Sequence, residues 1–292
     1  MAQKLFVKGR EGFGTGTVTT GSGTFKARLL TLATTANLVK AITACTGAAS
    51  PITLTVGSTT GWANGNYVLV RGITGNTCAN GVWVIANLTG TTFDLQTVPR
   101  IGGAQLASTG NGAATVTNAT VTNLSLSSAS TDLSAAAGGS TDQTLTSVGI
   151  TNGIFTSANP SWASVAANTV IDAIAVFQSA PTDRLVYITD GKIQVRVDAA
   201  ASTSATTLFV EPLYAPIPNS STIPLSNGVV ATLTAGANAG DTSLTVSALS
   251  AGVAIGHTGD VAFTNGGLPV TLGSQPTTFN YTVDATNGWF LL

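Results

Sequence analysis

The sequence is short of charged residues. Only 8% of its 292 residues are Asp, Glu, Lys or Arg, whereas soluble domains average about 25%. Thr, Ser, Asn and Gly occupy the polar positions instead. A surface of this composition forms hydrogen bonds readily but repels its neighbours only weakly, which favours a chain that packs into a large assembly.

Side chains that carry chemistry are also scarce. His257 is the only histidine, and it lies in a Gly-His-Thr-Gly-Asp context typical of a turn. A metal site needs several His, Cys or clustered carboxylates, and a glycosidase needs two facing carboxylates. The chain offers two glutamates and isolated aspartates such as Asp172 and Asp183. We therefore expect no enzyme, no catalytic residue, no metal and no cofactor.

Long apolar runs are absent as well. Residues 1–8 lack the apolar region of a secretory signal, and the longest nearly apolar stretch, residues 170–177, is too short to cross a membrane. The net charge of −1 lacks the basic excess of nucleic-acid proteins. In such a chain Cys45 and Cys78 are more often buried thiols than a disulfide, and their pairing stays open.

The charges are unevenly distributed. Residues 1–40 hold six basic residues and one acidic residue, whereas the rest of the chain holds five basic and eleven acidic ones. We expect residues 1–44 to form a Gly-rich, basic, extended arm that docks on an acidic partner. The alternative is a solvated tail. The candidate contact residues of this arm are Lys4, Lys8, Arg10, Lys26 and Arg28.

The abundant residues favour β structure. Gly, Thr and Val are common and helix formers are few, so short strands and tight turns are expected. Within a small β module at 45–101, turn signals separate four runs of strand character. These runs are residues 52–56, 67–70, 82–85 and 92–95.

The same module carries a sequence motif. It consists of Gly72-Ile-Thr-Gly75, then Asn80-Gly81-Val-Trp83-Val, then Gly90-Thr-Thr-Phe93-Asp-Leu95. The motif resembles a small β module that recurs in structural proteins of tailed bacteriophages, and also a β domain of ubiquitin-activating enzymes. The resemblance covers about a sixth of the chain and implies a type of module rather than an activity.

A connector of low complexity is expected at 102–159. It is rich in Thr, Ser and Ala, and its pentapeptide Ala114–Asn118 is repeated without change as Ala119–Asn123. Short repeats of β-branched and polar residues are typical of β-fibres and spacer strands.

Residues 160–292 are predicted to form a larger β-sandwich or jelly-roll-like domain. Asp190-Gly191 favours a hairpin with a two-residue type I′ turn, which would pair Ile188 with Ile193. One face of the hairpin would then be buried and the other wetted. Residues 242–256 also parallel residues 51–65, with a short strand followed by two glycines.

A proline-rich stretch follows this hairpin and indicates an edge or interface segment. Its prolines are Pro212, Pro216, Pro218 and Pro224, and we take them as further contact candidates. The pattern from residue 171 to the apolar C-terminal residues resembles head and collar proteins of phages.

These observations predict an all-β structural protein of a tailed-phage virion, made in the host cytoplasm. Within that class we expect a decoration (cement) protein on the outer capsid, bound to the major capsid protein, with a homotrimer as the expected assembly. The alternative is a collar, head-fibre or tail-fibre protein that binds host glycan, with Trp62 and Trp83 as stacking residues. A depolymerase or a bacterial adhesin has less support from the sequence.

Overall fold

The computed structural model of the chain is all-β, as predicted. The structure describes residues 5–31, 38–99, 105–126, 129–133, 135–213, 215–262, 268, 270–283 and 289–291. Among these, α1 (Val7–Thr15) is the one α-helix. The chain forms two compact units, each built from separate stretches. Unit 1 holds 39–123 and 192–264, and unit 2 holds 3–38, 124–191 and 265–292.

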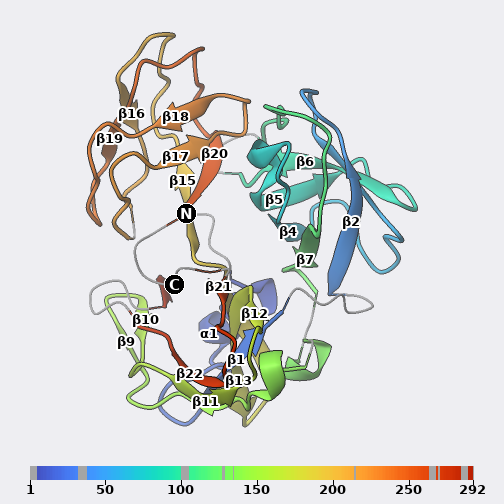
Figure 1. Ribbon diagram of the computed structural model, residues 1–292, viewed down its shortest axis with the longest axis vertical. Coiled ribbons are helices and arrows are strands. Elements are labelled where there is room, and N and C mark those ends of the chain that lie inside the picture. The colour runs from blue at the N-terminus through green and yellow to red at the C-terminus, as the bar shows by residue number, and fades with distance from the viewer. Residues whose placement is uncertain are drawn as a thin grey trace. The chain divides into compact units, whose positions relative to one another are not determined.

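The first part of unit 1 is a closed six-stranded barrel in which every pair is antiparallel (Figure 1). The four predicted runs at 52–95 all form strands here, because their apolar side chains alternate and fill the interior. Leu54, Phe93 and Leu95 are fully buried. In barrel order the strands are β2 (Val39–Cys45), β3 (Thr53–Val56), β6 (Thr92–Thr97), β5 (Gly81–Ala86), β4 (Tyr67–Arg71) and β7 (Thr120–Asn123).

The second part of unit 1, residues 192–262, is termed the duplicated module. Its strands form three antiparallel pairs around a core of their own, which all comes from residues 193–261. The pairs are β15 (Lys192–Arg196) with β20 (Thr258–Ala262), β16 (Thr207–Phe209) with β19 (Ser243–Thr245), and β17 (Thr222–Pro224) with β18 (Val230–Thr232).

Two halves of this module, 36 positions apart in sequence, have the same backbone pairing. Bridge Val197–Val210 corresponds to Leu233–Val246, and bridge Ala201–Val253 corresponds to Ala237–Ile217. The two halves meet where Leu208 pairs with its own counterpart, Leu244. Positive φ angles recur in step: Ser204 (68°) with Gly240 (87°), and Ser220 (65°) with Gly256 (92°). The module is therefore an internal duplication related by a pseudo-twofold axis.

The predicted parallel between 51–65 and 242–256 is matched at its second glycine, whereas at the first Gly61 has positive φ (81°) and Gly252 does not. Gly65 (φ 87°) and Gly256 (φ 92°) each stand two residues before a strand, β4 and β20 respectively. The 36-residue repeat itself was missed, although the apolar spacing Leu208, Val210, Leu213, Ile217 recurs as Leu244, Val246, Leu249, Val253.

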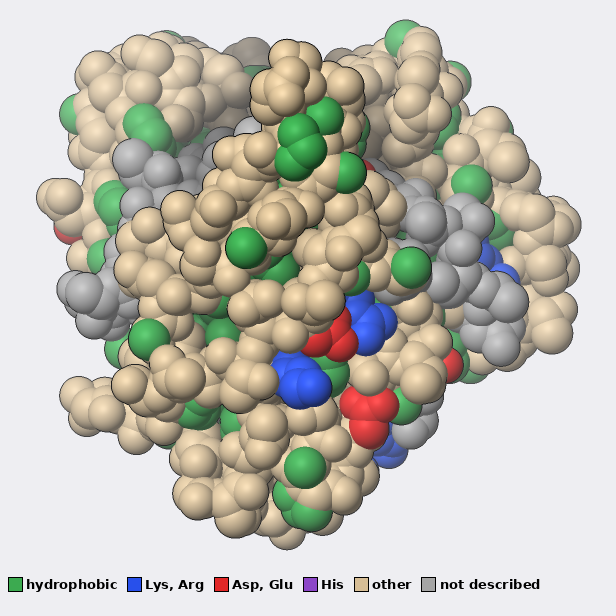
Figure 2. Space-filling model, turned by 60° about the horizontal axis from the view of Figure 1, so that its bottom comes forward, with side chains coloured by type: hydrophobic (Ala, Val, Ile, Leu, Met, Phe, Trp, Pro, Cys, Tyr) green, Lys and Arg blue, Asp and Glu red, His purple; other side chains and the backbone are tan. Residues whose placement is uncertain are grey.

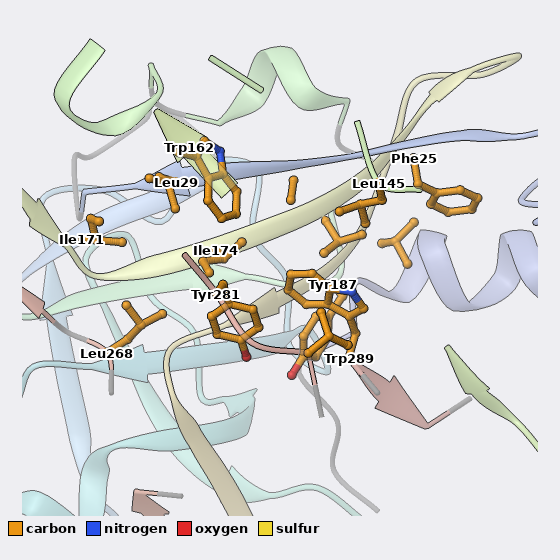
Figure 3. Close-up of a cluster of buried hydrophobic side chains, with 14 of the residues drawn as sticks. Phe25, Leu29, Leu145, Trp162, Ile171, Ile174, Tyr187, Leu268, Tyr281 and Trp289 are labelled. Carbon is orange, nitrogen blue, oxygen red and sulfur yellow. The ribbon is translucent and has the colours of Figure 1, made fainter. Parts of the chain in front are cut away.

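Unit 2 is built on a four-stranded sheet in the order β14 (Arg184–Thr189), β13 (Ala173–Ala180), β1 (Thr24–Leu30) and β8 (Gln143–Thr144). Its core combines aliphatic and large aromatic side chains from this sheet and from the segments packed on it (Figure 3). Phe25 lies 5.1 Å from Phe155, and Tyr281 stacks on Trp289 at 5.0 Å between ring centroids. Trp162 is fully buried in the same cluster.

Short elements complete the two units. In unit 2 a sheet is ordered β23 (Phe290–Leu291), β10 (Ile154–Thr156), β9 (Gly149–Thr151), and β11 (Ser161–Val165) pairs with β22 (Thr277–Asn280). A further pair joins β12 (Val170–Ile171) and β21 (Val270–Thr271). The 3-10 helices are η1 (Thr77–Ala79) in unit 1, and η2 (Ser130–Asp132) and η3 (Ala137–Gly139) in unit 2.

The prediction that residues 1–44 form an extended arm is wrong for the part that the structure describes. Residues 7–15 are helical, and β1 pairs with β13 along its whole length in the middle of the sheet. The segment 39–45 is a barrel strand. The alternation of buried Phe25, Ala27 and Leu29 with more exposed neighbours is the period of a half-buried strand, and the charges of Lys26 and Arg28 obscured it.

The predicted hairpin at Asp190-Gly191 is also wrong. β14 pairs with β13, and β15 pairs with β20, each over five residues. A type I′ turn needs positive φ at both central residues, but only Gly191 has it (71°). In that hairpin Leu185 and Tyr187 would lie on the wetted face, opposite Val186 and Ile188. Both are buried, because β14 contacts β13 and the helix α1.

The predicted domain limits differ from the two units. Residues 102–159 contribute β7 to the barrel and β8, β9 and β10 to unit 2, so they are more than a connector. Residues 160–292 are shared between both units. The jelly-roll-like order predicted for this stretch stays a prediction.

Candidate functional site

Among the described residues, exposed basic side chains lie on α1. Lys8 and Arg10 are on the solvent side of this helix, and Lys8 Nζ contacts Glu11 Oε2 at 2.8 Å. Glu11 therefore has a lowered pKa, mainly through its hydrogen bond from Lys8. Arg184 joins this surface by donating to the Lys8 carbonyl at 3.2 Å. We call Lys8, Arg10 and Arg184 the α1 surface.

The helix lies where it does because of two glycines on its other side. A Cβ on Gly9 would stand 2.7 Å from Leu185 O and from Val186 Cα, and one on Gly12 would stand 2.5 Å from a Val18 methyl. Only glycine permits this close approach to β14. The close packing turns the charged side chains of α1 outward.

The other predicted contact residues of the arm are less free. Arg28 forms a bidentate salt bridge with Asp142, in which Nε donates to Oδ1 at 2.7 Å and Nη2 donates to Oδ2 at 2.8 Å. It also donates to Ser130 O and lies over the Phe177 ring. Lys26 is half-buried on the same strand, and Lys4 lies outside the described residues. Arg28 therefore stabilises unit 2 internally.

The proline-rich stretch is part of the core of the duplicated module. Leu213, Ala215 and Ile217 are buried between the prolines, so the predicted edge or interface segment also supplies side chains to the core. The four proline contact candidates split by exposure: Pro212 and Pro218 are exposed, whereas Pro216 and Pro224 are half-buried.

The tryptophans proposed for glycan stacking are inside the barrel. Trp62 is 7% exposed and packs on Phe93 at 5.8 Å, and Lys40 Nζ stands over its ring at 5.4 Å. Trp83 is 1% exposed and donates from Nε1 to Ala79 O at 2.8 Å. Because a sugar must reach a ring face to stack on it, neither side chain forms a platform.

The isolated aspartates Asp172 and Asp183 do not face each other as a glycosidase pair would. Asp172 precedes β13 and Asp183 follows its far end, so the eight-residue strand separates them by about 25 Å. Asp183 instead accepts hydrogen bonds from Ser130 N and Oγ. Within the described residues no group of three or more His, Cys, Asp or Glu could hold a metal ion.

Two pairs of polar residues were not anticipated from the sequence. His257 Nδ1 is 2.8 Å from Ser226 Oγ, and Ser226 is fully buried. Asn76, also fully buried, donates to Thr46 O and Gly47 O and accepts from Asn111 N. Ser226 and Asn76 each bond to residues about 30 positions away in the sequence. Local residue spacing therefore gives no indication of these contacts.

Both cysteines are free and buried. Burial raises the pKa of Cys45 to about 11 and that of Cys78 to about 12. The thiols, in β2 and η1, are therefore protonated and buried.

Comparisons with known proteins found no match to a family model, to a curated protein or to a solved structure. In the part of the chain that the structure describes, no helix is long and apolar enough to cross a membrane. The function must therefore be argued from the surface and its chemistry. On the face shown in Figure 2, neutral side chains and backbone predominate and charged groups are few.

Proposed function

We propose that this chain is a non-enzymatic structural protein of a tailed-phage virion, a decoration protein bound to the outer capsid. The observation that carries the proposal is the nearly uncharged composition, 8% charged residues, on an all-β fold. When such a surface packs against a partner, few charged groups are removed from water, so the desolvation cost is small. Contacts made only in the assembled shell would stabilise that shell by linkage.

The α1 surface is the proposed point of attachment to the major capsid protein. It presents Lys8 and Arg10 on a helix whose backbone is fixed against β14. Electrostatic attraction to an acidic capsid surface would orient the protein and speed its binding. A homotrimer at a capsid threefold position is the arrangement that we propose.

The first test is to locate the chain in virions by cryo-EM. Density on the outer capsid with α1 against the major capsid protein is the expected result. Density at the neck or tail tip would overturn the decoration role and favour the fibre alternative. Binding of the wild-type protein to a glycan array then tests the fibre alternative. Trp62 and Trp83 are buried and cannot serve as its stacking residues.

The second test isolates the α1 surface. Lys8→Glu with Arg10→Glu should lower binding to undecorated capsid shells at least tenfold, and raised salt should reduce the difference. The control is Thr203→Glu with Thr242→Glu, which adds acidic charge at exposed positions of the module. Equal binding by both variants and the wild type would rule out the α1 contact.

A further inference from the structure

A hydrogen bond joins the buried Ser226 to His257. Ser226 Oγ accepts from Thr258 N at 3.1 Å and lies 2.8 Å from His257 Nδ1. Of these two partners only Nδ1 can accept the hydroxyl proton, and it does so when the imidazole is neutral with its proton on Nε2. A protonated Nδ1 would instead donate to Oγ.

This pair lies where the duplicated module joins the barrel. The Ser226 carbonyl accepts from Thr109 N at 2.6 Å, and Thr109 forms a parallel bridge with Asn227. A Cβ on Gly228 would stand 3.0 Å from Gly110 O. Segment 226–228 of the module is thus bonded directly to segment 105–110, which pairs with β6 of the barrel. We call this junction the seam.

The internal duplication shows that the fold of the module does not require this pair. The positions equivalent to Ser226 and His257 in the other half are Ala262 and Ser221. The backbone bonds correspond: Val197 N donates to His257 O, and Leu233 N donates to Ser221 O. The equivalent pair of positions therefore carries no histidine.

We propose that His257 is a pH-sensitive latch that holds the seam while its imidazole is neutral and releases it on protonation. When Nδ1 carries a proton, both it and the Thr258 amide donate toward the same Ser226 oxygen. The hydroxyl proton then loses its acceptor inside the protein. An unmade buried hydrogen bond is costly, so the closed seam disfavours the charged imidazole.

Electrostatics agree with this geometry. Burial lowers the pKa of His257 below its usual 6.5. Among the charged groups on the neighbouring strands, Asp198 is exposed, the Arg196 guanidinium donates to Val98 O, and Asp260 lies beside Gly81. The pKa of His257 is lower in the folded protein than in the unfolded chain. Its contribution to the stability of the closed seam is therefore complete above about pH 6.5 and is lost progressively as the pH falls below that value.

The test uses the full chain, in which His257 is the only histidine and gives one imidazole NMR signal. Its pKa should lie below 6.5. Hydrogen exchange should show the opening constant of the Thr109, Ser226 and Thr258 amides rising up to about tenfold per pH unit below that value. Amides of the unit 2 sheet, such as Val176, serve as the internal control and should not change.

His257→Gln should remove this pH dependence, because glutamine can accept the Ser226 proton but does not titrate. A measured pKa at or above the usual 6.5 would overturn the proposal. So would equal pH dependence in the wild type and His257→Gln. If the variant fails to fold, the wild-type titration and the amide exchange decide on their own. The result is independent of where the protein resides in a virion.

Discussion

At the scale of the residue, single glycines decide where α1 can lie. A Cβ on Gly9 would meet the backbone of β14, whereas a Cβ on Gly14 of the same helix would have nothing within 4 Å. Gly9→Ala should destabilise the protein by about 1–3 kcal/mol through the forced displacement of the helix. Gly14→Ala should be neutral or stabilising by up to about 1 kcal/mol. Urea unfolding of both variants measures this, and equal effects would contradict the packing described.

The two thiols give a second prediction at this scale. With pKa values of about 11 and 12, both thiols are protonated at about pH 8, and both are buried. Because the thiolate is the reactive form, neither should react with a thiol reagent in the folded protein. Both should react in urea. Rapid labelling of one thiol before unfolding would show that the barrel opens locally at that residue.

At the scale of the element, identical sequences adopt different structures. Ala119–Asn123 supplies β7 of the barrel, whereas its copy Ala114–Asn118 lies outside the strands and ends in Asn118 at φ 53°. The second copy is a strand because β2 and β4 flank it and complete its hydrogen bonds. The sequence predicted β character, but the choice between the copies depends on tertiary contacts.

Matched substitutions test this difference. Val121 is fully buried, whereas Val116 is partly exposed. Val121→Ala should destabilise the protein by about 2 kcal/mol, and Val116→Ala by less than about 0.5 kcal/mol. Chemical denaturation of the two variants provides the measurement. A larger cost at Val116 would mean that the first copy is the structural one.

The elements that the sequence predicted well are those with local signals. The strands at 52–95 combine alternation with Gly-rich turns, and they were found nearly to the residue. The strands β14 and β15 were also found, but not their partners, because partner choice depends on segments distant in sequence. The Ser226–His257 pair and the burial of Trp62 depend on the same long-range contacts, so the candidate site was harder to predict than the strands.

At the scale of the whole molecule, the chain passes between its two units several times, so neither unit is a continuous segment. Composition and low-complexity stretches suggested four consecutive segments instead. Such signals mark where the polypeptide changes character, but compactness depends on which strands pair. β1 and β13 pair along their whole length although about 140 residues of sequence separate them.

A fragment of residues 160–292 tests this organisation. It contains every strand of the duplicated module and its whole core. It also contains β13 and β14 but lacks β1, the neighbour of β13 in the sheet. Because unpaired strands with missing core partners cannot stay ordered, we expect amides at 173–189 to exchange freely. Amides at 193–261 should stay protected, and the full chain is the control. Protection across the whole fragment would show that residues 160–292 fold as one domain, as composition alone suggested.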